Sequence, residues 1–129
     1  MELRIRRKVK RGYTTDGVLL SDRGKRLADT AEYTPLMLPA GRYQLKLTIA
    51  PRKYDYRVIE VLRENGSPLP SCTFIHRKNG VYTNGSSISI GEHLTAGVVI
   101  RTQQAFSRLI KRLEKYMSRT HEVVILDIG

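Results

Sequence analysis

The chain has 129 residues, a formal net charge of +11, 40% hydrophobic residues and 27% charged residues. This length predicts one compact domain spanning residues 1–129, and the balance of apolar and charged residues excludes wholesale disorder. No apolar run approaches the roughly 20 residues that cross a bilayer, and the N-terminal MELRIRRKVK lacks the apolar stretch of a secretory signal. We therefore expect a soluble, cytoplasmic protein without a membrane span.

Cys72 is the only cysteine, so the sequence allows neither an internal disulfide nor a multi-cysteine metal site. We interpret it as a small, semi-buried residue, because no neighbouring residue supplies an activating base. His93 and His121 have no partner in the sequence pattern and are interpreted as structural. P-loop, GxGxxG, HExxH and GxSxG motifs are absent, and the sequence predicts no cofactor or metal.

In chain order, the sequence first predicts a strand with one buried face, because apolar and basic residues alternate over residues 3–10. Turn-forming residues at 15–17 and 21–24 bracket a short second strand over residues 18–20. A third strand is expected over residues 27–32. These elements together predict a basic outer surface near the N-terminus.

Four further strands are expected over residues 43–49, 54–62, 73–76 and 88–90. Pro51 ends the first of these, and the turn signal at residues 64–68 closes the second. The polar loop 77–87 separates the last two.

One helix is predicted over residues 103–117, because apolar side chains recur there at three- and four-residue spacing. Thr102 is its expected N-cap, and its apolar stripe should pack on the sheet while its basic face meets water. A terminal strand follows at residues 122–128. The predicted fold class is mostly β (α+β): a compact mixed or antiparallel β-sheet or barrel-like domain with one amphipathic C-terminal helix and a terminal strand.

The positive charge is concentrated in residues 1–11 and 101–119, which contribute +5 each. Such a field attracts polyanions, which include nucleic acid, anionic cell-wall polymers and acidic partner proteins. The alternative interpretation is a solvated surface that keeps a small protein soluble. The candidate polyanion-binding residues are Arg4, Arg6, Lys8, Arg108, Lys111 and Lys115.

A second candidate site lies around His76 and Ser87. A histidine at one strand edge and a serine opening the next strand, joined by a polar glycine-rich loop, could bring a base and a hydroxyl together. Arg77, Asn79 and Ser86 are the candidate binding residues beside them. The same pattern also fits turn hydroxyls and a hydrogen-bonded, partly buried histidine.

Five segments of the chain occur in a familiar order. They are Thr15-Asp16-Gly17, Asp29-Thr30-Ala31-Glu32, Leu38-Pro39-Ala40-Gly41-Arg42-Tyr43, Ile75-His76-Arg77-Lys78-Asn79 and Ser86-Ser87-Ile88-Ser89-Ile90-Gly91. This order resembles a family of small uncharacterised proteins from bacteria and their phages, whose members carry a Thr/Gly turn, a Thr-Leu-Glu-like segment, Ile-Pro-Ala-Gly-x-Tyr, Ile-His-x-Gly-Asn and Gly-Cys-Ile-x-x-Gly. That family is similar, more distantly, to the L,D-transpeptidase fold, in which a His and a Gly-Cys pair serve acyl transfer on peptidoglycan stem peptides.

The chain departs from this pattern at the residues that would carry the chemistry. Ser87 stands where the family has Cys, Ser86 where it has Gly, and Lys78 where it has the Gly before Asn79. A serine hydroxyl needs an adjacent base throughout the reaction, whereas a thiol reaches its nucleophilic form readily near neutral pH. The arginine that the transpeptidase pattern places near Ser89 is also missing. The departures indicate that any transferase chemistry has been lost or was never present in this branch.

Three hypotheses about function follow. The leading one is a non-catalytic family member whose transpeptidase-like cleft around His76, Asn79 and Ser87 binds a peptide or glycan. The second is a polyanion-binding module for partners such as nucleic acid, although no aromatic residues interleave with its basic faces. The third is a serine acyl transferase or hydrolase acting on cell-wall peptides, with Ser87 as nucleophile and His76 as base.

Overall fold

The computed structural model describes residues 1–49, 57–70, 73–76 and 86–129. The helices within these residues are the 3-10 turn η1 (Thr34–Leu36) and α1 (Thr102–Thr120). The strands are β1 (Glu2–Arg11), β2 (Thr14–Leu20), β3 (Arg26–Tyr33), β4 (Gly41–Ile49), β5 (Arg57–Arg63), β6 (Thr73–His76), β7 (Ile88–Thr95), β8 (Val98–Ile100) and β9 (Val124–Ile128). The predicted fold class, mostly β with one C-terminal helix and a terminal strand, is confirmed.

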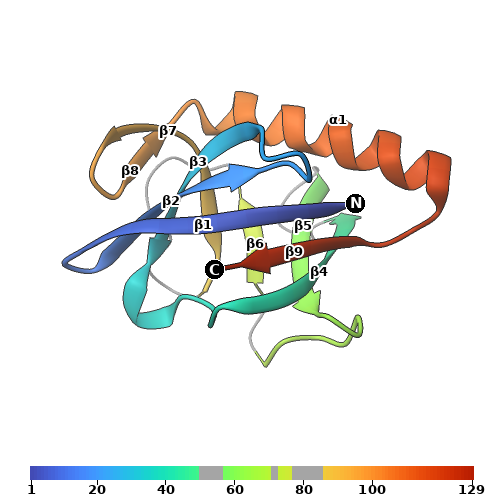
Figure 1. The fold of residues 1–129 in the computed structure, drawn as a ribbon, viewed down its shortest axis with the longest axis horizontal. Coiled ribbons are helices and arrows are strands. Elements are labelled where there is room, and N and C mark those ends of the chain that lie inside the picture. Colours follow the sequence, from blue (N-terminus) through green and yellow to red (C-terminus); the bar gives the residue numbers. More distant parts are fainter. Residues whose placement is uncertain (50–56, 71–72, 77–85) are drawn as a thin grey trace.

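The strands of the described residues form one mixed sheet in the order β3-β2-β1-β9-β4-β5-β6-β7-β8. The pairs β1–β9 and β6–β7 are parallel, and the others are antiparallel. Because β3 also pairs with β7, the sheet closes into a ring from which β8 extends. In Figure 1, β1, β9 and β4 run side by side across the view, and α1 lies along one side of the molecule. Ring closure gives the sheet an enclosed interior.

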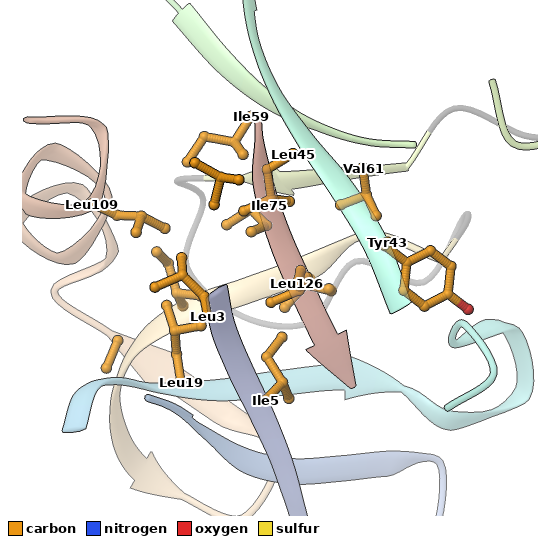
Figure 2. Close-up of a cluster of buried hydrophobic side chains, with 14 of the residues drawn as sticks. Leu3, Ile5, Leu19, Tyr43, Leu45, Ile59, Val61, Ile75, Leu109 and Leu126 are labelled. Atoms are coloured by element: carbon orange, nitrogen blue, oxygen red, sulfur yellow. The ribbon is translucent and has the colours of Figure 1, made fainter. Parts of the chain in front are cut away.

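Alternate side chains from each strand fill this interior. Leu3 and Ile5 of β1 are fully buried, whereas Arg4 and Arg6, which alternate with them, are exposed. Figure 2 shows aliphatic side chains from β1, β4, β5, β6 and β9 meeting in one cluster, with Leu109 of α1 pointing toward them. The two-residue period of burial explains why the alternating segments of the sequence predict strands correctly.

Helix α1 packs an apolar stripe, Ala105, Phe106, Leu109 and Leu113, against β7 and β3. The predicted N-cap, Thr102, is wrong: the cap position is Arg101, whose backbone is left-handed (φ 54°) and whose side chain makes no capping hydrogen bond. Thr102 is instead the first helical residue and is only 2% exposed, because its methyl group packs beside Gly91. Within the described residues, no helix is both long and apolar enough to cross a membrane.

The turn predicted at residues 15–17 is also wrong, because these residues lie inside β2. The chain turns earlier, at Gly12, whose φ of 55° lies in the left-handed region. Gly17 serves close packing between strands: a Cβ there would lie 2.5 Å from the carbonyl oxygen of Arg6. A glycine required for close approach is not distinguishable from a turn glycine in the sequence alone.

The remaining strands agree with their predictions except at their ends. Strand β6 has the predicted bounds, and β7 begins at the predicted residue but continues to Thr95. Strand β8 was not predicted, and part of the predicted strand 54–62 lies outside the described residues. The terminal strand begins at Val124 rather than at residue 122.

A buried ion pair crosses the interior of the ring. The Glu32 side chain is 0% exposed, and Arg7 reaches it from β1 with Nε and Nη2 donating to the two carboxylate oxygens at 2.9 and 2.8 Å. The same Nη2 donates to the carbonyl oxygen of Leu38 at 2.6 Å. Removing one partner of such a pair leaves an uncompensated buried charge, so the two residues depend on each other. Arg7 therefore does not add to the basic surface of β1.

Candidate functional site

The His76 and Ser87 region lies where β6 and β7 run parallel. Ile75 pairs with Ile88 and His76 pairs with Ser89 in the register of these strands. Ile75 and Ile88 are fully buried in the core. Because side chains alternate along a strand, His76, Ser87 and Ser89 belong to the opposite face of the sheet.

The hydrogen bonds of this region connect β6 to the chain at the start of β7. The His76 ring nitrogen Nε2 lies 3.1 Å from the Ser89 hydroxyl. The Ser87 hydroxyl accepts a hydrogen bond from the Phe74 backbone N–H at 3.1 Å. One residue earlier, the Ser86 hydroxyl bonds that of Thr73. Each serine therefore serves as a link between the two strands.

The arrangement differs from the base and hydroxyl that the sequence suggested. Both predicted residues lie at the β6–β7 seam, but the His76 ring bonds the Ser89 hydroxyl and not the Ser87 hydroxyl. Ser87 is 4% exposed and Ser89 is 0% exposed, so both hydroxyls are shielded from solvent. Ser89 is not among the predicted site residues. The signal that could have found it is the parallel pairing of Ile75 with Ile88, which places Ser89 opposite His76.

Several predicted residues lie outside the part of the chain that the structure describes. These are Cys72 and the candidate binding residues Arg77 and Asn79. Ser86 is described and is buried against Thr73.

A second polar cluster lies in an open groove beneath the β7–β8 hairpin. The groove has a volume of about 530 Å³, and Asp16, Asp29 and His93 are among its lining residues. The His93 ring is 30% exposed, and its Nε2–H donates to the Thr30 carbonyl oxygen at 2.9 Å. Its two ring nitrogens each lie 3.7 Å from a carboxylate oxygen, Nε2 from that of Asp16 and Nδ1 from that of Asp29. His93 has no partner in the sequence pattern, because its partners are more than 60 residues away in the chain.

The two carboxylates of this groove hold the β7–β8 hairpin against β2 and β3. Asp29 accepts the His93 backbone N–H at 2.8 Å, and Asp16 accepts the Gly97 backbone N–H at 3.1 and 3.0 Å. Arg26 pairs with Asp29 at 2.7 Å. Burial acts to raise the pKa of Asp29, but the hydrogen bond from His93 and the pairing with Arg26 outweigh it and lower the pKa below its ordinary value of 3.8.

The polyanion candidates lie on two surfaces. Arg4, Arg6 and Lys8 are exposed on the outer face of β1, and Arg108, Lys111 and Lys115 are exposed on α1. Acidic residues accompany the β1 surface: Arg4 pairs in register with Asp127, and Glu2 forms an ion pair with Arg42. Glu114 lies on α1, so both surfaces carry acidic residues beside their cations.

No group of three or more His, Cys, Asp or Glu side chains in the described ranges is arranged to hold a metal ion. Comparisons with protein-family models, curated proteins and solved structures gave no match to this chain. The resemblance to the bacterial and phage family, and through it to the L,D-transpeptidase fold, therefore stays a prediction from the motifs.

The lowered pKa of Asp29 predicts how stability depends on pH. A carboxylate with a lowered folded-state pKa stabilises the fold fully above its unfolded pKa of about 3.9, and the contribution is lost as pH falls through the folded-state pKa. We expect Asp29→Asn to lower the free energy of unfolding by about 1–3 kcal/mol at pH 7. Urea unfolding measured at pH 7, 5, 4 and 3 should show this difference narrowing below pH 4.

The matched control is Asp22→Asn, at an exposed carboxylate in the β2–β3 turn. It should change stability by less than about 0.5 kcal/mol at every pH. An Asp29→Asn protein that matches this control at pH 7 would contradict the structural role given to Asp29.

Proposed function

We propose that this chain is a non-catalytic binding protein, in which the residues that match the family's His and Cys positions hold β6 and β7 together. The observation that carries this proposal is the bonding of Ser87, whose hydroxyl accepts the Phe74 N–H at 3.1 Å. A serine nucleophile also donates its proton to an adjacent base, and among the described residues no hydrogen bond joins the Ser87 hydroxyl to a base. The bond of His76 Nε2 to the fully buried Ser89 supports the same interpretation.

Serine-directed probes test this proposal. We expect a fluorophosphonate and a β-lactam probe to leave the protein unlabelled in intact-mass spectra, because Ser87 is shielded and its hydroxyl is engaged by the backbone. Ser118→Ala, at an exposed helix serine, serves as the control for non-specific labelling. Labelling that maps to Ser87 and disappears in His76→Ala would show an acyl-transfer or hydrolytic enzyme instead.

A second proposal concerns the ligand: the basic face of α1 binds an anionic polymer. The observation that favours it is the alignment of Arg108, Lys111, Arg112, Lys115 and Arg119 along one stripe of the helix, at three- and four-residue spacing. The stripe is about 16 Å long at 1.5 Å per residue. A row of cations of this length attracts a repeating anion more strongly than it attracts a single charge.

Duplex DNA is a defined probe for this proposal. We expect the affinity for a 12-base-pair duplex to fall steeply with salt, with each phosphate contact contributing a slope of about −0.9 in log K against log salt. Lys111→Glu and Lys115→Glu should each weaken binding and flatten this slope, as measured by fluorescence anisotropy. Lys46→Glu makes the same charge change at an exposed position of β4 and should have a smaller effect.

A dissociation constant above roughly 1 mM at low salt would overturn the polyanion proposal. If Lys46→Glu and Lys111→Glu weakened DNA binding equally, the binding would be a general attraction to the net charge of the protein and not a property of the helix. Peptide or glycan binding near His76 stays a separate prediction, because Arg77 and Asn79 lie outside the described residues.

A further inference from the structure

A groove with basic walls and an apolar floor separates the β2–β3 turn from α1. Its volume is about 200 Å³. Lys25 and Arg26 stand on the side of the turn, and Arg108 and Arg112 stand on the helix. The apolar lining residues are Leu19, Leu27, Ala28, Ile90, Ala105 and Leu109.

The charge of this groove is positive and largely unneutralised. No acidic residue is among its described lining residues. Arg26 is paired with Asp29, whereas Lys25, Arg108 and Arg112 form no ion pair with any carboxylate that the structure describes. Three cations therefore face one small space whose apolar floor lowers the local dielectric and strengthens their attraction for an anion.

We propose that this groove binds a phosphate group of a phosphodiester polymer. This inference rests on the proposal that α1 binds an anionic polymer, and it specifies where one anionic group binds and that this group is a phosphate. Arg108 and Arg112 lie one helical turn apart, and arginine guanidinium groups bind phosphate oxygens in bidentate geometry. Lys25 adds a point charge from the opposite wall.

The size and surroundings of the groove suit this anion. A volume of about 200 Å³ equals roughly seven water molecules at ~30 Å³ each. That space holds a phosphate together with part of the sugar or glycerol unit attached to it, which would lie on the apolar floor. Beyond the groove, Lys115 and Arg119 continue the row along the helix, where the next phosphates of a polymer would follow.

The sharpest test uses Lys25, because it lies outside the helix and only the groove gives it a role. In the anisotropy assay with the 12-base-pair duplex, Lys25→Gln should weaken binding about fivefold and flatten the salt slope by about 1. Arg23→Gln removes one charge from an exposed position in the same turn that does not line the groove, and it should have little effect. Circular dichroism would verify that both variants fold.

Inorganic phosphate distinguishes the groove from the polymer. It should shift the backbone amide signals of Ala28 and Ala105 in nitrogen–proton NMR spectra of the wild type, and Lys25→Gln should reduce the shifts. Phosphate binding there without DNA binding would support the groove and overturn both the polymer and the polyanion proposal.

Other outcomes would overturn the groove assignment. Equal effects of Lys25→Gln and Arg23→Gln on DNA binding would overturn it while leaving polyanion binding by the helix intact. Poly-glutamate that binds as tightly as DNA, with the same dependence on Lys25, would overturn the assignment to phosphate. The absence of binding by both phosphate and DNA would overturn the inference together with the proposal on which it rests.

Discussion

The fully buried carboxylate of Glu32 requires a cationic partner inside the ring, and this requirement ties β3 to β1. It lies on β3 opposite Ile88 of β7, and Arg7 neutralises it from β1. Ile88 is also paired with Ile75 of β6, so its position is fixed from both sides. A slip of one residue in β7 would bring Ser87 and Ser89 to the interior face and move Ile88 out of the core. The buried pairing of Ile88 with Ile75 places Ser89 opposite His76.

This register explains why the candidate site could be located from the sequence but not assembled correctly. The strands around His76 and Ser87 follow from their apolar runs, and the resemblance to the bacterial and phage family implies that these strands are neighbours. The residue opposite His76 depends on the register of the parallel pairing between β6 and β7. No local sequence pattern specifies that register. His93 shows the same limit, because its carboxylate partners come from β2 and β3.

The fold itself was largely predictable because strands and helix follow hydrophobic periodicity. The errors occurred where one residue type serves two structural purposes. Gly17 fits a turn in the sequence but permits close contact inside a strand, and Thr102 fits a cap but packs beside Gly91. Basic residues are ambiguous in the same way, because the sequence does not show which of them face solvent. Arg7 belongs to a basic run but neutralises the buried carboxylate of Glu32, whereas the predicted cations of α1 are exposed.

The Ser87 hydroxyl has a structural role, as an acceptor for the backbone of β6. Hydrogen exchange at the Phe74 amide, followed residue by residue with NMR, measures that bond directly. This role predicts slow exchange at Phe74 in the wild type and several-fold faster exchange in Ser87→Ala, with the amides of β1 and β9 unchanged. Exchange at Phe74 that is fast in the wild type, or that Ser87→Ala leaves unaltered, would contradict it and return Ser87 to the list of candidate nucleophiles.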